Sequence, residues 1–367
     1  MADKKSFYLK YRPHQLKNIV GQKPVVATLK QAALRNEFAH AYLFSGNHGC
    51  GKTSTARILA MLMTCEDIKD GSNCGKCRIC KGIQAGSTLD VKELDGATKR
   101  KIEDIRDLID SAYYSPNELK RKIYIIDECH MLTKEATSAL LKILEEPPSY
   151  LTFILCTTDI KKIIPTILSR CQRFNFTKIL SSDIASRLSL IAKNENINIE
   201  KDGFMTMAKM ARGSMRDAIG YLDQVATVGA NKAITAKGIS SYFGTVDRQA
   251  IINIMKAIMS GDIPLVLDQV NDMIMASADV SGILYEISEA FRNTMILKAQ
   301  NNDSRLIDLP DYEIKELKDI SDKLKIGQLL KLAKLFSDVE KKVKFNINER
   351  WIMEATLIHC VALLRQQ

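Results

Sequence analysis

A glycine-rich segment carries the residue types and spacing of a phosphate-binding loop. Residues 46–53 fit the pattern Gly-x-x-x-x-Gly-Lys-Ser/Thr at every fixed position. The glycines let the backbone curl so that its N–H groups face phosphate oxygens, and the following helix N-terminus adds partial positive charge. Lys52 is expected to contact the β- and γ-phosphates and Thr53 to be a ligand of Mg²⁺. A chance glycine loop is the alternative, which the strand signal before the loop and the helix signal after it disfavour. The residues predicted to bind a nucleotide here are Gly46, Asn47, His48, Gly49, Cys50, Gly51, Lys52, Thr53 and Ser54.

An acidic pair downstream supplies the other groups that triphosphate hydrolysis needs. Asp127 and Glu128 end an apolar run that is typical of a strand buried on both faces. Ligands of parallel sheets bind at the carboxyl ends of such strands. We expect Asp127 to hold Mg²⁺, directly or through water, and Glu128 to orient and polarise the attacking water. The alternative is a carboxylate pair that merely opens a helix, and His130 beside it could simply pack or bond locally.

Four cysteines within sixteen residues form a candidate metal site. They are Cys65, Cys74, Cys77 and Cys80. Four thiolates leave no open coordination position, so they suit a structural Zn²⁺, with an iron–sulfur cluster as the rival. Buried free thiols are a poor alternative in a segment this rich in glycine and lysine. The segment predicts a structural metal that stiffens an insert and performs no chemistry.

The excess positive charge lies entirely in the first half of the chain. The 367 residues carry a net charge of +10, and residues 1–178 hold 29 Lys/Arg against 19 Asp/Glu. This surplus indicates a polyanionic partner, although a solubilising surface would look the same. No apolar run is long enough to span a bilayer, and the first residues lack a signal-peptide core. A cytoplasmic location is therefore expected.

Strand and helix signals alternate as far as residue 178 and become helical afterwards. Strands are predicted at 41–45, 121–127, 151–156 and 171–176, and helices at 22–36, from 52, and at 134–144. The alternation predicts an α/β fold class with a doubly wound parallel sheet. Later helices are predicted at 183–194, 202–211 and 215–228, a turn at 229–233, and further helices from about 245, with breaks at 261–264, 308–310 and 345–348. We expect three domains, at 1–178, 179–243 and 244–367: an α/β domain with the phosphate loop and the metal-binding insert 65–80, a small helical domain and a larger all-helical domain.

Further short motifs accompany the loop, the acidic pair and the cysteines. They are Tyr8–Pro13 with Val20–Gln22, Leu144–Pro148, Thr157–Asp159, Ser169–Cys171 and Gly213–Arg216. In this order the motifs resemble those of the AAA+ ATPases and, within them, the gamma/tau family of bacterial DNA polymerase III clamp-loader subunits. The resemblance spans most of residues 7–220, whereas residues 245–367 match only in length and helical character. Cys50 departs from the usual loop residues and would be open to oxidation if its thiolate were stabilised beside phosphate.

The resemblance implies roles for residues outside the loop. Tyr11, Arg12 and Pro13 would lie near the adenine. Thr158, with Thr157 beside it, would take the first sensor position and hydrogen-bond the γ-phosphate or the attacking water. Arg170 would be an arginine finger that reaches the γ-phosphate held by a neighbouring subunit, and Arg216 would be the second sensor within its own subunit. Arginine suits both tasks because it stays charged and offers a planar fork to phosphate oxygens, although a surface salt bridge is its usual role.

The resemblance also implies cofactors, partners and a biological task. ATP and Mg²⁺ would occupy the loop, and zinc is preferred for the cysteines because related clamp loaders carry it. The chain would be the ATP-hydrolysing motor subunit of the bacterial replicative clamp loader, within the DNA polymerase III holoenzyme. It would assemble with delta and delta-prime subunits and copies of itself into a hetero-pentamer through its C-terminal helical collar. That assembly would open the sliding clamp and load it onto primer–template DNA, contacting the phosphate backbone and no membrane.

Two alternatives remain open at this point. The first is another AAA+ motor of DNA metabolism, such as a helicase loader or a branch-migration ATPase, which the cysteine insert and the Ser169–Cys171 motif disfavour. The second is a structural subunit that does not hydrolyse ATP, which the intact loop and acidic pair disfavour.

Overall fold

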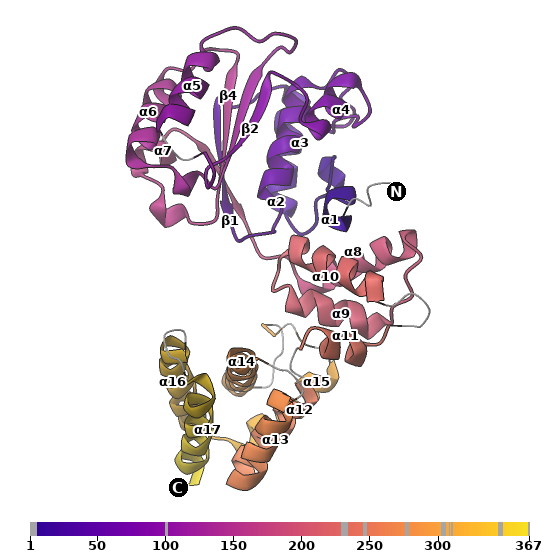
Figure 1. Ribbon diagram of the computed structural model, residues 1–367, viewed down its shortest axis with the longest axis vertical. Helices are drawn as coiled ribbons and strands as arrows, with labels where there is room; N and C mark the ends of the chain where they lie inside the picture. The colour runs from indigo at the N-terminus through magenta and orange to yellow at the C-terminus, as the bar shows by residue number, and fades with distance from the viewer. Residues whose placement is uncertain are drawn as a thin grey trace. The chain divides into compact units, whose positions relative to one another are not determined.

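The computed structural model divides the chain into two compact units, Met1–Lys232 and Ala233–Gln367 (Figure 1). It describes residues 6–99, 102–228, 234–244, 248–275, 279–301, 306–307, 309, 311–343 and 348–365. None of the helices in these ranges combines the length and the apolar character that a bilayer crossing needs. The three-domain division at 178 and 243 stays a prediction.

A five-stranded parallel sheet organises the first unit. Its strands are β1 (Ala41–Gly46), β2 (Val91–Asp95), β3 (Lys122–Asp127), β4 (Leu151–Thr157) and β5 (Gln172–Phe176). Their order is β2-β3-β4-β1-β5, and every neighbouring pair is parallel. The central strands β1, β3 and β4 are buried along almost their whole length, as expected where helices cover both faces. The predicted doubly wound α/β fold is confirmed.

Helices cover both faces of this sheet (Figure 1). One face packs against α2 (Lys23–Arg35) and α3 (Lys52–Thr64), and the other against α5 (Ile102–Ala112) and α6 (Lys134–Glu145). Side chains of β1 alternate between the two cores because successive strand residues point to opposite faces. Tyr42 and Phe44 therefore enter one core and Leu43 the other.

Among the longer elements of the first unit, β2, α4 (Arg78–Ala85) and α5 have no counterpart among the predicted ones. Strand β2 has the sequence Val-Lys-Glu-Leu-Asp, and only Leu94 in it is fully buried. An edge strand tolerates such charged side chains, since one side of it faces solvent. The strand therefore lacked the apolar pattern on which the other four predictions relied.

Short elements and a helical group complete the first unit. The short elements are α1 (Phe7–Lys10), η1 (Leu16–Asn18), η2 (Cys129–Met131), η3 (Ile160–Lys162) and α7 (Pro165–Leu168). The helical group consists of α8 (Ser181–Asn194), α9 (Lys201–Met210) and α10 (Met215–Val228), which pack on one another. These three helices confirm the predicted ones to within two residues, and the predicted turn at 229–233 lies outside the described residues.

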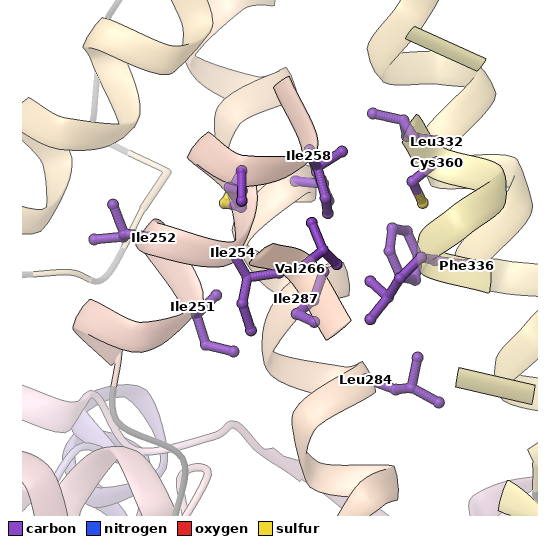
Figure 2. Packing of buried hydrophobic residues seen from close by; sticks show 14 of the residues in the cluster. Ile251, Ile252, Ile254, Ile258, Val266, Leu284, Ile287, Leu332, Phe336 and Cys360 are labelled. Carbon is purple, nitrogen blue, oxygen red and sulfur yellow. The ribbon is translucent and has the colours of Figure 1, made fainter. Parts of the chain in front are cut away.

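The second unit is helical throughout its described part. Its helices are α11 (Ala236–Tyr242), α12 (Arg248–Ser260), α13 (Ile263–Met275), α14 (Val280–Ala299), α15 (Asp311–Lys323), α16 (Ile326–Val343) and α17 (Glu349–Arg365). Ile254, Ile287 and Phe336, from three different helices, meet in one apolar cluster (Figure 2). The predicted break at 261–264 occurs at Gly261, whose φ of 80° ends α12. The other two predicted breaks fall partly outside the described residues.

Candidate functional site

The glycine-rich loop connects the end of β1 to the start of α3, as predicted. Two of its glycines are required by close backbone approach. A Cβ on Gly46 would lie 2.3 Å from the backbone oxygen of Phe176, and one on Gly49 would lie 1.9 Å from Ser214 Oγ. Gly49 also has a φ of 68°, which side-chain-bearing residues rarely adopt. The loop therefore needs these glycines for its shape.

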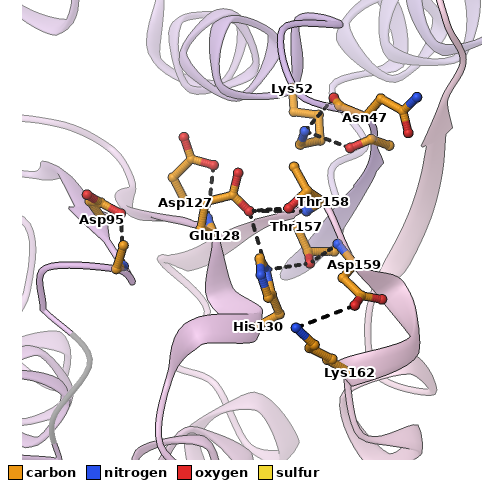
Figure 3. A network of polar contacts seen from close by, with 12 residues as sticks. Asn47, Lys52, Asp95, Asp127, Glu128, His130, Thr157, Thr158, Asp159 and Lys162 are labelled. Atoms are coloured by element: carbon orange, nitrogen blue, oxygen red, sulfur yellow. Dashed lines mark hydrogen bonds and ion pairs between the residues drawn. The ribbon is translucent and has the colours of Figure 1, made fainter. Parts of the chain in front are cut away.

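Lys52 is held inside the loop. Its side chain is buried, and Nζ donates hydrogen bonds to the backbone oxygens of Gly46 (2.7 Å) and Asn47 (2.8 Å) (Figure 3). Within the described part of the chain these partners are neutral carbonyls, so the positive charge of Lys52 has no carboxylate to neutralise it. A buried cation of this kind attracts an anion such as phosphate.

The two predicted Mg²⁺ ligands lie together. Thr53 Oγ1 donates a hydrogen bond of 2.6 Å to Asp127 Oδ2. Thr53 is in the first turn of α3 and Asp127 ends β3, so the fold brings residues 74 positions apart into contact. A hydroxyl and a carboxylate are the oxygen donors that suit Mg²⁺.

Glu128 lies at the centre of a polar network at the end of β3 (Figure 3). Its Oε2 accepts hydrogen bonds from Thr158 N (3.2 Å) and Thr158 Oγ1 (2.8 Å) and lies 3.3 Å from His130 Nδ1. Thr157 Oγ1 lies 3.1 Å from the same nitrogen of His130. The two threonines therefore differ, since Thr158 contacts Glu128 directly whereas Thr157 contacts it through His130.

Glu128 has a left-handed backbone, with φ 46° and ψ 44°. Residues other than glycine adopt this region at a cost, which is often met at functional sites. The conformation directs the chain from the end of β3 into η2. Glu128 thus combines a strained backbone with a carboxylate that makes three contacts with two residues, Thr158 and His130.

A pocket of about 400 Å³ adjoins the loop. Its walls come from the N-terminal segment, the loop, the ends of β2 and β3, and the helical group α8–α10. The predicted residues Tyr11, Arg12 and Pro13 all line it. Arg12 Nε also donates to Ser54 Oγ at 3.2 Å, and burial lowers the pKa of the Arg12 guanidinium. Burial, together with a hydrogen bond to Glu195, raises the pKa of Tyr11 to about 12.

The start of α10 closes one side of this pocket. The backbone N–H of Met215 donates to the backbone oxygen of Gly49 at 3.0 Å, which joins the helical group to the loop. Arg216 lines the pocket, and its guanidinium carbon lies 5.3 Å from the centre of the Tyr8 ring. The structure therefore brings Arg216 to the predicted site with its planar fork over an aromatic face.

Arg170 lies elsewhere on the first unit. It follows α7, it is not among the residues that line the pocket, and its side chain is 30% exposed. Its guanidinium pairs with Glu145 and donates to the backbone oxygen of Thr166 at 2.8 Å. Arg170 is therefore a partly exposed arginine outside the pocket of its own chain.

The four predicted metal ligands converge. The Sγ atoms of Cys65, Cys74, Cys77 and Cys80 all lie within 4.8 Å of one another. Metal–sulfur distances of about 2.3 Å in a tetrahedron place sulfurs roughly 3.8 Å apart, so the cluster fits a zinc ion after a small contraction. The backbone N–H groups of Cys74, Cys77 and Cys80 each point at the sulfur of the preceding cysteine, at 3.3, 3.3 and 3.4 Å. These N–H groups would stabilise negative charge on the sulfurs.

The condition set for oxidation of Cys50, a stabilised thiolate, is not met. The side chain is 1% exposed, and its thiol donates to the backbone oxygen of Asn47 at 2.8 Å. Burial raises the pKa of this thiol, so the reactive thiolate is disfavoured.

Several pocket residues escaped the sequence analysis: Glu93, Ile179, Arg187 and Ile219. Ile219 lies four residues after Met215 on α10, and this helical spacing was the one signal that could have placed it beside the pocket. Ile179 and Arg187 reach the pocket only through packing of the helical group. Glu93 belongs to the unpredicted strand β2, where it pairs with Arg57 at 2.5 and 2.9 Å.

Three family models match consecutive parts of the chain. Residues 21–180 match "DNA polymerase III, delta subunit", and residues 183–231 match "DNA polymerase III clamp loader subunit, ATPase lid domain". Residues 234–366 match "DNA polymerase III subunits gamma and tau domain III". The matches include the C-terminal third, where the sequence motifs gave no specific signal.

Curated relatives carry the same names. The chain is 40% identical over 293 residues to the DNA polymerase III subunit gamma/tau of Mycoplasma genitalium, covering 80% of this chain and 49% of that protein. It is 31% identical to the DNA polymerase III subunit gamma of Buchnera aphidicola subsp. Schizaphis graminum, covering 97% of this chain and 98% of the relative. The chain thus spans about half of the first relative and nearly all of the second.

Solved structures include a Holliday junction branch migration motor, Thermotoga maritima RuvB. It aligns with 68% of this chain and 79% of its own, at 21% identity and a TM-score of 0.48. This low score carries no argument for a branch-migration function.

Proposed function

Since this chain belongs to the gamma/tau family of DNA polymerase III subunits and has their AAA+ α/β fold, we propose that it is the ATP-hydrolysing motor subunit of a bacterial clamp loader. The observation that carries the proposal is the meeting of Thr53 with Asp127 beside the Glu128–Thr158 pair. These side chains come from the start of α3 and from the ends of β3 and β4, and they would place the Mg²⁺ ligands and the water-polarising carboxylate at one edge of the sheet. A subunit that only supports the assembly would have no need of that set.

The loop and the pocket divide the binding of ATP between them. Lys52 and the loop N–H groups would hold the phosphates. Tyr11, Arg12 and Pro13 would hold the adenine side, since they line the pocket that adjoins the loop. Arg216 would contact the nucleotide from α10 as the second sensor. The bound nucleotide would then hold the helical group α8–α10, the lid, against the loop.

Hydrolysis would proceed by attack of water on the γ-phosphorus. Thr53 and Asp127 would hold Mg²⁺, which neutralises phosphate charge when bound. Glu128 would orient and polarise the water, and Thr158 would fix the Glu128 carboxylate through the two hydrogen bonds it donates. Thr157 would support the same group through His130. The strained backbone of Glu128 fits a residue held for one task.

Arg170 would complete the site of a neighbouring subunit. Its pairing with Glu145 is partly exposed, so exchange for a phosphate of another subunit would cost little. Hydrolysis would then depend on assembly, because the positive charge that stabilises the transition state comes from the neighbouring subunit.

The cysteine cluster would hold one structural Zn²⁺ through Cys65, Cys74, Cys77 and Cys80. The convergence of four sulfurs and the donation of three backbone N–H groups to them support zinc at this site. With four protein ligands the ion would bind no substrate.

Membership of the family supports a proposal for the partners. The chain would assemble with delta and delta-prime subunits and copies of itself into a hetero-pentamer, with the helical second unit as the collar. In the cytoplasm this assembly would open the sliding clamp and close it on primer–template DNA, contributing to the DNA polymerase III holoenzyme. The positive surplus of residues 1–178 would contact the phosphate backbone.

The test measures ATP hydrolysis by the assembled complex, with and without clamp and primer–template DNA. Lys52→Ala should lower nucleotide binding and reduce hydrolysis by about a hundredfold or more, because it removes the phosphate-contacting cation. Lys23→Ala, at an exposed position on α2, is the matched control and should behave as wild type. Normal hydrolysis by Lys52→Ala would contradict the proposal, and stimulation of wild type by clamp and DNA would support the clamp-loading task.

A further inference from the structure

The segment that follows Pro13 is tied to the cysteine cluster. Asn73, directly before Cys74, donates from Nδ2 to the backbone oxygen of His14 at 2.8 Å. In the opposite direction, Gln15 Nε2 donates to the backbone oxygens of Asn73 (3.0 Å) and Cys74 (3.4 Å). Donation from both sides fixes residues 14–15 against residues 73–74.

Asn73 is in turn held by the interior of the cluster. It is 1% exposed, and its Nδ2 lies 3.6 Å from Met61 Sδ and 4.0 Å from Cys80 Sγ. Cys80 is fully buried and is one of the four converging sulfurs. The position of the Asn73 amide therefore depends on the closure of the cluster.

The cluster also holds the far end of the helix that begins at the phosphate loop. Cys65 directly follows α3, whose first residues are Lys52 and Thr53. Near the loop, the same helix receives the hydrogen bond from Arg12 to Ser54. The pocket-lining segment is thus connected to α3 at one end directly and at the other through the cluster.

We propose that the cysteine cluster is a brace for residues 11–13, with Gln15 and Asn73 as positioning residues, so that its metal content sets the affinity for ATP. The inference rests on the proposed nucleotide and zinc sites and adds an energetic connection between them. Without the metal the four thiols are not drawn together, and the loop around Gly71 and Gly75 is free to open. Residues 14–15 then lose a fixed partner, and ordering the segment on the nucleotide costs affinity.

The first experiment compares two glutamines in the zinc-loaded full chain. Gln15→Met keeps the length of the side chain and removes its donor, and a fluorescent, non-hydrolysable ATP analogue is the probe. Binding should weaken about two- to tenfold, the effect of one lost hydrogen bond, with the zinc content unchanged. Gln84→Met is the matched control, because Gln84 donates to Gly75 in the same cluster, at 3.2 Å, and not to residues 11–15. It should leave the affinity within twofold of wild type.

The second experiment removes zinc with a chelator from wild type and from the Gln15→Met/Asn73→Ala variant. The wild type should lose affinity for the analogue, whereas the variant, already uncoupled, should lose little more. Such non-additivity marks a shared pathway, and a merely structural effect would lower both proteins by the same factor. In steady state, Gln15→Met should raise KM for ATP with kcat nearly unchanged.

The outcomes separate the brace from the proposed function. Equal affinities of Gln15→Met and Gln84→Met, or no change of wild-type affinity on loss of zinc, would overturn the brace. Should the wild type unfold on chelation, the comparison of the two glutamine variants decides alone. Failure of Lys52→Ala to weaken binding of the same analogue would instead overturn the nucleotide site itself.

Discussion

The two units bury charge in different ways. In the first unit Lys52, Asp90 and Lys122 are buried, and the structure gives each of them backbone partners. In the second unit the buried Glu313 pairs with Arg248 at 3.1 Å. These buried charges of the first unit are therefore hydrogen-bonded to peptide groups, whereas the buried Glu313 of the second unit is bonded to an opposite charge.

The difference extends to the rest of the interiors. In the second unit the buried hydroxyls of Thr294 and Thr356 donate within their own helices, to the backbone oxygens of Ala290 and Ile352 at 2.8 and 2.6 Å. Around them the second unit packs one apolar cluster (Figure 2). In the first unit, Thr157 contacts a histidine beside a strained glutamate.

This contrast predicts which substitutions should change activity and which should change stability. A charged side chain that is hydrogen-bonded only to peptide groups keeps its net charge and can still attract a ligand. A charged side chain that is paired with an opposite charge is neutralised. Substitutions at the edge of the first unit should therefore change activity, and those in the interior of the second should change stability. Of the three predictions below, in order of the expected effect, the first two test this separation and the third tests how peptide groups stabilise a buried charge in the first unit.

The largest effect is expected from Arg170→Ala in the first unit. Hydrolysis by the assembled complex should fall about a thousandfold, because a transition-state cation supplied in trans is lost. ATP binding should persist, since Arg170 does not line its own pocket. Single-turnover hydrolysis and nucleotide binding measure the two properties.

Arg173→Ala is the control for this prediction, because Arg173 is an exposed arginine three residues away. It should hydrolyse ATP at the wild-type rate. Normal hydrolysis by Arg170→Ala would contradict the assignment of Arg170 as an arginine finger.

Phe336→Ala should have the largest effect on stability. Phe336 is 1% exposed, and its ring stacks on Phe291 with centres 5.6 Å apart. Truncation should lower the free energy of unfolding of the second unit by about 3–5 kcal/mol. Thermal unfolding measures the loss, and binding of an ATP analogue to the folded variant should remain as in wild type. Leu330→Ala, at an exposed position on the same helix, should cost about 0.5 kcal/mol or less.

A smaller, pH-dependent effect is expected from Asp90→Asn in the first unit. The Asp90 carboxylate accepts hydrogen bonds from the backbone N–H groups of residues 117, 118 and 119, at 2.8, 2.7 and 2.9 Å. Burial alone would raise its pKa, but these bonds and Lys122 hold it below the ordinary 3.8. The asparagine should cost roughly 1–3 kcal/mol at pH 7, since part of this acceptor capacity is lost.

The sign of the pH dependence follows from the lowered pKa. The native carboxylate holds its proton less tightly than the unfolded one, so its stabilisation is full above pH 3.8 and is lost as the pH falls through the native pKa. Urea unfolding at pH 7 and near pH 3 measures the difference in free energy of unfolding between wild type and Asp90→Asn. This difference should be smaller at the acidic pH. Asp110→Asn, at an exposed position on α5, should have the wild-type free energy of unfolding at both pH values. A difference between wild type and Asp90→Asn that is the same at both pH values would contradict the lowered pKa of Asp90.

The phosphate loop and the acidic pair could be read from the sequence because their functions require fixed residue types at fixed spacing. The contact between Thr53 and Asp127 then followed from the parallel sheet, which aligns the carboxyl ends of its strands. The four cysteines were found for the same reason. The roles of the loop, the acidic pair and the cysteines in binding and catalysis stay predictions.

The remainder of the site depends on packing that no local pattern records. Ile179 and Arg187 line the pocket because the helical group packs there, and as single residues they resemble any core isoleucine or surface arginine. Strand β2 was missed because its position at an edge removed the apolar signal, and Glu93 was missed with it. The connection from Gln15 to Asn73 joins residues 58 positions apart in two irregular segments.

Gly49 has a mechanical consequence for the pocket. With Ser214 where a side chain would stand and the Met215 amide bonded to its carbonyl, this glycine joins the loop directly to the first turn of α10. We therefore expect a rearrangement of the loop peptide to reach α10 without an intervening side chain and to change the tilt of that helix.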